Sequence, residues 1–198
     1  MRVRDQNIEW LRKHVFRSAS QMTHSHIMVP SASLASMYEV GTSRLPGFEF
    51  DVAGQFCFDS FALPFDMDPD FDLKFRLHYT GVSTTAADTY TWKGFYNNAL
   101  SAGAAADPAT AFGVDFGAAN VLSGTAYQIG RTGWGSIPGK TWTRAQVEAG
   151  HIIGVEFELD ASDATLATEQ AYLVGYEFSF VRQETRGEGS ASDYDSAS

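Results

Sequence analysis

The chain has 198 residues, of which 44% are hydrophobic and 14% aromatic, and its formal net charge is −10. A chain of this length can form one domain whose core is large enough to need no cross-links. Its single cysteine, Cys57, excludes an intrachain disulfide and a cysteine-based structural zinc site. No apolar run has the length of a signal peptide or a membrane span, so we expect a soluble protein made in the cytoplasm, with no membrane partner.

Positive charge is concentrated at the start of the chain. Residues 1–17 contain five basic and two acidic side chains, a net charge of +3, which leaves −13 for the remainder. Because an acidic body repels phosphate, we expect the folded domain to bind no nucleic acid.

Residues 1–23 carry a long helical pattern. Asp5 suits an N-cap, and Ile8, Leu11 and Val15 recur at helical spacing. The pattern predicts a basic amphipathic arm that is helical. A helix of this length is marginal in water unless its apolar stripe is buried, so we expect the arm to bind a partner surface. The residues predicted to make this contact are Arg2, Arg4, Trp10, Leu11, Arg12, Val15 and Phe16.

Residues 24–182 read as short strands separated by clusters of glycine, proline, serine and aspartate. Leu73, Phe75 and Leu77 alternate with polar residues, which is the pattern of a strand with one buried and one solvated face. Such strands favour antiparallel sheets, so the sequence predicts an all-β sandwich or barrel. The predicted strands are 24–30, 36–41, 54–63, 72–80, 89–97, 110–116, 126–131, 152–160 and 171–182.

A short helix and a polar tail complete the predicted elements. In "TRAQVEAG", Thr143 suits an N-cap, Gln146 is its capping-box partner, and Gly150 suits a helix stop. The Gly/Ala-rich segment 101–140 reads mainly as long loops. Residues 183–198 are small, polar and acidic, which predicts a flexible tail.

The sequence contains partial matches to a nucleotide-binding motif and to catalytic nucleophile motifs, but essential residues of each are absent. Gly139 and Lys140 match the end of a phosphate-binding P-loop, but Trp134 stands where the motif requires a glycine. Ser136 is not in a nucleophile elbow, and Cys57 alternates with phenylalanines as a core residue does. We therefore predict no catalytic residue and no cofactor.

Histidines and aspartates suggest metal binding only in part. His24 and His26 would project from one strand face, but no further ligand follows at the spacing that cupins use. Asp66, Asp68 and Asp70 suit the acidic positions of an EF-hand, but Phe71 stands where its glycine must be. We interpret residues 64–71 as a hairpin loop with solvated carboxylates and predict no metal ligand, leaving a loosely coordinated calcium ion as the alternative.

Several segments together resemble a known family. They are "GQFCFDSFALPFDMDPDFDLKFRLHYTG", "YTWKGFY", "WTRAQVEAGHIIGVEFELDAS" and "AYLVGYEFSFVRQ", which span roughly residues 50–182. This succession resembles the jelly-roll cement or decoration proteins of tailed bacteriophage capsids. The resemblance implies a non-enzymatic structural protein of the virion, a homotrimer at the capsid surface that binds the major capsid protein between capsomers and stabilises the head.

Two other functions remain open from the sequence. A jelly-roll carbohydrate- or receptor-binding module of a phage tail or fibre would use Trp92, Trp134 and Trp142 as an aromatic platform and the aspartate loop as a calcium site. A cupin-like metal enzyme would need His24 and His26 to meet two further ligands.

Overall fold

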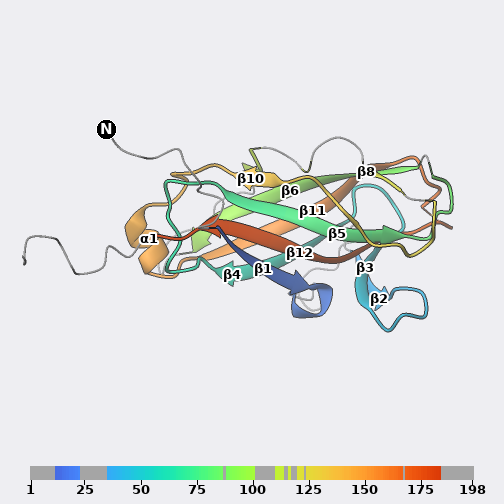
Figure 1. Cartoon of the computed structure of the whole chain (residues 1–198), viewed down its shortest axis with the longest axis horizontal. Coiled ribbons are helices and arrows are strands. Elements are labelled where there is room, and N and C mark those ends of the chain that lie inside the picture. Colours follow the sequence, from blue (N-terminus) through green and yellow to red (C-terminus); the bar gives the residue numbers. More distant parts are fainter. Residues whose placement is uncertain are drawn as a thin grey trace, which may run out of the picture.

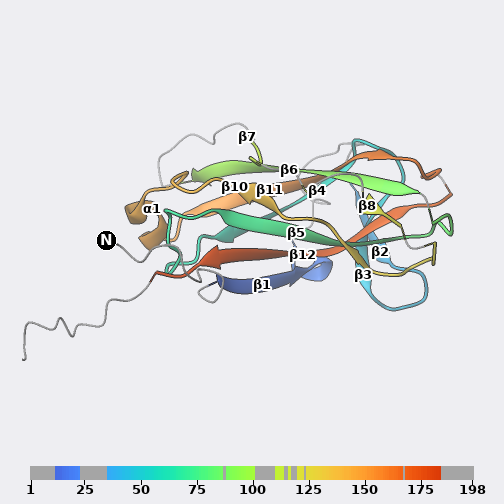
Figure 2. The same ribbon diagram turned by 45° about the horizontal axis from the view of Figure 1, so that its top comes forward.

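The computed structural model describes residues 12–22, 35–86, 88–100, 110–113, 116, 120–122, 124–166 and 168–183. Over this part of the chain, two antiparallel sheets pack face to face as an elongated sandwich (Figure 1). Figure 2 separates the layers, with β5, β12 and β1 in one sheet and β6, β11 and β4 in the other. The predicted all-β antiparallel sandwich is therefore confirmed.

Among the described residues, the larger sheet has seven strands and the smaller has five. The strands of the seven-stranded sheet are β1 (Arg12–Ser18), β2 (Ser36–Glu39), β3 (Pro46–Phe50), β5 (Leu73–Gly81), β9 (Gly130–Arg131), β10 (Gly135–Ile137) and β12 (Ala171–Val181). Those of the five-stranded sheet are β4 (Phe56–Ala62), β6 (Thr89–Leu100), β7 (Thr110–Ala111), β8 (Asn120–Val121) and β11 (Ile152–Ser162). The helices are the 3-10 turn η2 (Ala19–Gln21) and α1 (Arg144–Glu148).

The strand order identifies the kind of sandwich. The main paths are β10–β5–β12–β3–β2 in one sheet and β4–β11–β6–β7 in the other. The chain changes sheet from β3 to β4, β4 to β5, β5 to β6, β8 to β9, β10 to β11 and β11 to β12. Strands that lie next to each other therefore come from distant parts of the sequence, as in the two Greek keys of a jelly roll.

The core between the sheets is built from aromatic side chains at alternate strand positions. Phe75 of β5 and Phe157 of β11 are fully buried, and Tyr176 of β12 contacts both rings at centroid distances of 6.0 and 4.8 Å. Trp92 of β6 is 1% exposed and meets Phe50 edge-on. Fully burying each such ring contributes about 1.5–3 kcal/mol of apolar transfer free energy, so these rings contribute strongly to the packing of the two sheets.

The predicted N-terminal helix is wrong where the structure describes it. Residues 12–18 form strand β1, which pairs along its whole length with β12, from Arg12 opposite Val181 to Ser18 opposite Gly175. Pairing with β12 supplies backbone hydrogen bonds and places Val15, which is partly buried, against the core, and these outweigh the weak local preference for helix. Residues 12–22 therefore belong to the sandwich. Residues 1–11 lie outside the described residues.

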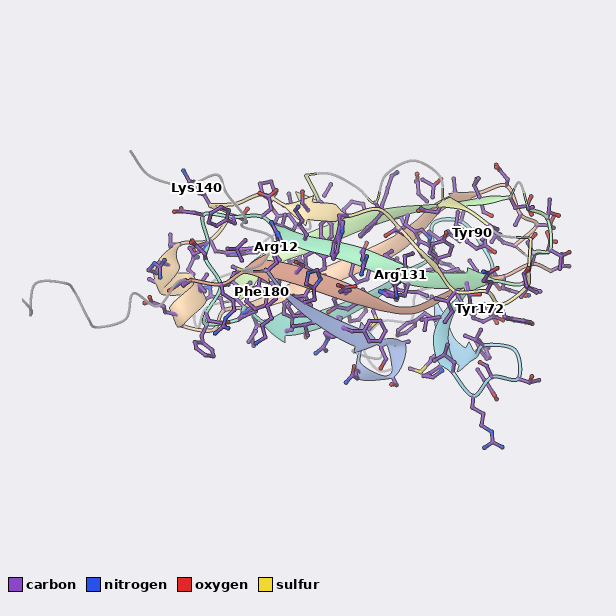
Figure 3. All side chains as sticks on the ribbon, in the orientation of Figure 1. Arg12, Tyr90, Arg131, Lys140, Tyr172 and Phe180 are labelled. Atoms are coloured by element: carbon purple, nitrogen blue, oxygen red, sulfur yellow. The ribbon has the colours of Figure 1, made fainter. Side chains whose placement is uncertain are left out.

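Strand β1 completes an edge that β3 leaves open. Strand β3 pairs with residues 171–173 of β12, whereas β1 pairs with residues 175–181 on the same side. On the other side of β12, the register with β5 shifts between Leu173 and Gly175. In Figure 3, Phe180 and Arg12 lie toward the α1 end of the sandwich, and Tyr172 lies toward the β2–β3 end. Two segments of the chain thus line up end to end along β12.

The other predicted elements match the structure unevenly. Strands β4, β5, β6, β11 and β12 overlap the predicted ranges closely, and α1 has the predicted Thr143 cap and capping box with Gln146. Strands β3, β8 and β10 are absent from the predicted ranges, and the predicted strand 24–30 and the tail beyond residue 183 lie outside the described residues. Among the described helices, none is long and apolar enough to cross a membrane.

Candidate interaction surfaces

The outer face of the seven-stranded sheet carries a compact charged cluster centred on Glu177 of β12. One carboxylate oxygen of Glu177 lies 2.5 Å from Nδ1 of His14 on β1. The other accepts a hydrogen bond from Nε of Arg76 on β5, at 2.7 Å, and lies 3.5 Å from Nε2 of His78. Because β1 and β5 flank β12 on opposite sides, this carboxylate links three adjacent strands.

Aromatic rings cover the same cluster. The guanidinium of Arg76 lies 4.7 Å from the ring centroid of Trp134, which meets His14 edge-on at 5.8 Å. Phe16 of β1 meets His78 edge-on at 5.0 Å between centroids. The outward side chains of β1 are therefore held against β5 across the width of β12.

The protonation states follow from these contacts. Burial raises the pKa of Glu177, but the hydrogen bonds from His14 and Arg76 outweigh it and lower the pKa overall. Burial, aided by the positive charge of Arg131, lowers the pKa of His78. Glu177 is therefore ionised and His78 neutral at pH 7. Because the Glu177 carboxylate already accepts hydrogen bonds from its neighbours, we interpret it as a structural group that holds β1 against β12.

The inner face of β1 is tied to the opposite sheet by a second ion pair. Asp59 of β4 is fully buried and accepts hydrogen bonds from Nε and Nη2 of Arg17 at 2.5 and 3.0 Å. The hydroxyl of Tyr176 donates to the same carboxylate at 2.8 Å. Burial and the adjacent negative charge raise the pKa of Tyr176, so the phenol remains a donor. Strand β1 is thus fixed to both layers of the sandwich.

The outer face of the five-stranded sheet has a different character, because its side chains form a regular grid around a hollow. Residues 154, 156 and 158 of β11 pair with residues 60, 58 and 56 of β4 and with residues 97, 95 and 93 of β6. The middle row is Phe58, Glu156 and Phe95. In the next row, Gly154 lies between Ser60 and Asn97. The missing side chain at Gly154 leaves a concavity of about 410 Å³.

We name this concavity the Glu156 pocket and define it by Phe58, Ser60, Phe95, Asn97, Gly154 and Glu156. Burial among the strands and the charge of Glu158 raise the pKa of Glu156. Among the described residues, no hydrogen bond or ion pair satisfies its carboxylate. Perturbed carboxyl groups in concave sites are candidates for binding or chemistry, and this one has an aromatic ring on each side.

The aspartate loop is largely engaged with its own surroundings. Asp66 accepts a hydrogen bond from Arg182 at 2.8 Å, Asp72 accepts one from the backbone N–H of Gly139 at 2.9 Å, and Asp68 caps the N–H of Asp70. Within the described residues, no three His, Cys, Asp or Glu side chains are grouped to hold a metal ion. Asp68 and Asp72 take part in the turns of this loop, and Asp66 forms an ion pair between the loop and the end of β12.

The remaining predicted features lie apart from one another. Trp92 and Trp142 are buried in the core, at 1% and 5% exposure, so they form no surface platform with Trp134. Cys57 is fully buried, and burial raises the pKa of its thiol, which removes thiolate character. Lys140 lies in a turn next to the aspartate loop, and its N–H donates to Pro69.

The residues predicted to bind a partner divide into two groups. Arg12, Val15 and Phe16 belong to β1, where Val15 packs on the core and Phe16 is 49% exposed on the outer face. The other predicted contact residues and the histidine pair lie outside the described residues; they are Arg2, Arg4, Trp10, Leu11, His24 and His26. Sequence reasoning missed the Glu156 pocket, because its rows become visible only once β4, β11 and β6 are known to pair.

Comparisons with known proteins return little similarity. The sequence matches no protein-family model and no curated protein. Two solved structures of infectious bursal disease virus resemble the fold: the Gx strain, at 11% identity and TM-score 0.19, and the VP2 subviral particle, at 10% identity and TM-score 0.18. The alignments cover 87% of this chain and 42% and 41% of those chains, so this chain spans about two fifths of their length. At such TM-scores, the likeness carries no argument about function.

Proposed function

We propose that this chain is a structural protein of a virus particle, and more specifically a cement or decoration protein that binds the capsid of a tailed bacteriophage. The observation that carries the proposal is the jelly-roll strand order of the segments whose sequence resembles that family. Since a fold alone does not fix a function, the surfaces of the sandwich must supply the binding.

The N-terminal segment, residues 1–11, is the first candidate for this binding. Strand β1 is held by the Glu177 cluster on its outer face and by Asp59 on its inner face. Residues 1–11 directly precede this firmly attached strand. This segment contains Arg2, Arg4 and Trp10, and arginine and tryptophan are the residue types most enriched at binding hot spots. We assign it the contact with the major capsid protein or a neighbouring copy in a homotrimer.

The sandwich itself offers places for self-association. Phe65 in the aspartate loop is 76% exposed, and Tyr38 of β2 is 54% exposed. Exposed large apolar side chains at the ends of a sandwich favour contacts between subunits or with a shell. Light scattering of the full chain at micromolar concentration tests the proposed trimer, and a strictly monomeric protein contradicts that part of the proposal.

The decisive experiment is binding of the purified full chain to capsids of the source virus that lack it, measured by co-sedimentation and by cryo-electron microscopy. The expected result is a regular array of copies between capsomers. Deleting residues 1–11 retains β1 and should weaken binding, and Trp10→Ala should weaken it more than Arg2→Ala. A chain that is absent from native particles and does not bind capsids refutes the proposal.

The deletion must stop before β1. Removing residues 1–20 would remove β1 and the ion pairs of His14 and Arg17, and it would expose the edge of β12. Loss of binding in that variant would report unfolding or aggregation as much as a lost contact. The deletion of residues 1–11 is therefore the informative one, with circular dichroism and urea unfolding as checks that the sandwich is intact.

A sugar- or receptor-binding module of a tail or fibre is the second candidate, and one observation favours it. The Glu156 pocket has aromatic rings, a carboxylate and the amide of Asn97 within one concavity, a combination that can also bind a sugar. The tryptophans expected to form the sugar platform do not meet, because two of them are in the core. Glycan-array binding that depends on Phe58 would support this candidate over a capsid role.

A further inference from the structure

The Glu156 pocket provides the chemistry for recognising a cation. Glu156 lies in one cross-strand row with Phe58 on β4 and Phe95 on β6. Neighbouring strands lie about 4.8 Å apart, so the two phenylalanines project from backbones separated by about 9–10 Å. The Glu156 side chain projects from the strand midway between them, so a group bound at its carboxylate would lie between the two rings.

The energetics of the empty pocket favour a positively charged occupant. Burial and Glu158 raise the pKa of Glu156, which means that its ionised form is poorly solvated where it lies. A cation that enters the pocket supplies the missing counter-charge and can also lie against the faces of the phenyl rings. A neutral occupant would gain the ring contacts but would leave the carboxylate without a partner.

The shape of the pocket distinguishes among cations. A guanidinium is planar, weakly hydrated and able to donate two parallel hydrogen bonds to one carboxylate while stacking on aromatic faces. An ammonium is compact and strongly hydrated, and it gains less from two flanking rings. Beside the row, a Cβ added to Gly154 would find its nearest neighbours 3.9 Å away in Asn97, so the floor has room for an aliphatic stem.

Charge on the whole molecule agrees with this assignment. Residues 12–183, which contain the sandwich, hold 11 basic and 18 acidic side chains, a net charge of −7, so the sandwich attracts basic segments. Around the pocket, Glu158 adds a second negative charge in the adjacent row, beside Lys93, which is paired with Asp160 at 2.6 Å. The site is thus a local negative centre on an acidic body.

We propose that the Glu156 pocket binds an arginine side chain of a partner protein, which stacks between Phe58 and Phe95 and pairs with the Glu156 carboxylate. This gives the five-stranded sheet a docking role separate from that of the N-terminal segment, which leads into β1 of the seven-stranded sheet. Binding of arginine at the pocket is independent of the proposed function. Only the identification of the partner as a shell subunit rests on it.

The test uses the purified full chain and three small probes: the N-acetyl methylamides of arginine, lysine and citrulline. Citrulline has nearly the shape of arginine but no charge. In nitrogen-15 NMR titrations, the arginine probe should shift the amide signals of residues 58, 95, 97, 154 and 156. It should bind about tenfold or more tightly than citrulline and several-fold more tightly than lysine.

Three variants locate the interaction. Glu156→Gln should weaken the arginine probe about tenfold or more, because the amide cannot replace the counter-charge. Gly154→Val, which keeps every charge and suits a strand, should fill the hollow and also weaken binding. Glu158→Gln is the matched control, since it removes one carboxylate from the same face of β11 in the next row. It should change affinity by no more than about threefold.

Several outcomes would overturn the inference. Equal binding of citrulline, shifts located elsewhere on the molecule, or an effect of Glu158→Gln as large as that of Glu156→Gln would each do so. Shifts of the pocket by methyl glycosides, with none by the arginine probe, would replace it with sugar binding. The arginine titration and the capsid-binding assay, applied to the wild type and to Glu156→Gln, separate the two proposals. If the wild-type chain binds the arginine probe but does not bind capsids, the shell role is refuted and the pocket proposal stands.

Discussion

Replacing Arg17 by methionine tests whether β1 is fastened to both sheets. Arg17 donates two hydrogen bonds to the fully buried carboxylate of Asp59 and a third to the carbonyl of Gln21. Removing one partner of a buried pair costs about 3–5 kcal/mol, because the other charge is left without compensation. The hydroxyl of Tyr176 and the N–H of Ser60 still donate to Asp59, so we expect a loss near the lower end, about 3 kcal/mol.

Urea unfolding followed by tryptophan fluorescence measures this loss. With an m-value of about 2 kcal/mol per molar, the midpoint should fall by about 1.5 M in Arg17→Met. Lys13→Met is the control on the same strand: Lys13 is exposed and its Nζ lies 6.0 Å from the Phe180 ring centroid, so the change should stay within about 0.5 kcal/mol.

The double variant Arg17→Met/Asp59→Asn identifies the cause. If the penalty comes from an uncompensated buried carboxylate, an uncharged amide at residue 59 removes most of it, and the double variant should be more stable than Arg17→Met alone. A loss below about 1 kcal/mol in Arg17→Met, or additive losses in the double variant, would refute the reasoning that this ion pair holds β1 to the five-stranded sheet.

Three further predictions follow from other contacts. Gly175→Ala should destabilise the protein by about 2 kcal/mol or more, since a Cβ there would collide with the β1 backbone. Gly154→Ala, the control, should be neutral or slightly stabilising. Thermal unfolding compares the two variants, and equal effects would contradict the pairing of β1 with β12. The lowered pKa of His78 means that the unfolded chain binds a proton before the folded chain as pH falls below 6.5, so the free energy of unfolding should decline there. Urea midpoints measured against pH should decline less steeply in His78→Gln. The same pH dependence in the variant and the wild type would argue against a buried neutral imidazole. Asp72→Ala should lower the free energy of unfolding by about 1–2 kcal/mol, because it removes the hydrogen bond from the N–H of Gly139, while Asp70→Ala should lower it by less than about 0.5 kcal/mol. A calcium-dependent rise in melting temperature that both changes abolish would revive the metal site.

The strongest sequence patterns were local, and they were read correctly. Alternation of more and less buried residues in β5 and β11 follows from the two-residue period of a strand and needs no knowledge of the partner strand, whereas every residue of β12 is buried. The capping box of α1 is equally local, because Thr143 and Gln146 satisfy each other's backbone groups within one turn. Short strands without alternation, such as β10, carry no such signal.

The N-terminal segment shows where local reading fails. Val15 fits a helical stripe with Leu11 and equally fits a strand in which residues 13, 15 and 17 share a face. Local propensity differs between the two by only a few tenths of a kcal/mol per residue. The open edge of β12 beyond β3 and the buried carboxylate of Asp59 decide the outcome, and both arise from residues more than 40 positions away.

The sequence by itself determined the all-β class, the faces of the long strands and the acidic character of the body, because these depend on composition and on a period of two residues. Only the tertiary structure decided that β1 joins the seven-stranded sheet, that Glu177 gathers His14 and Arg76, and that Glu156 lies between Phe58 and Phe95. Each of these depends on strand pairing between distant segments, and a shift of one residue in register would turn every side chain to the other face.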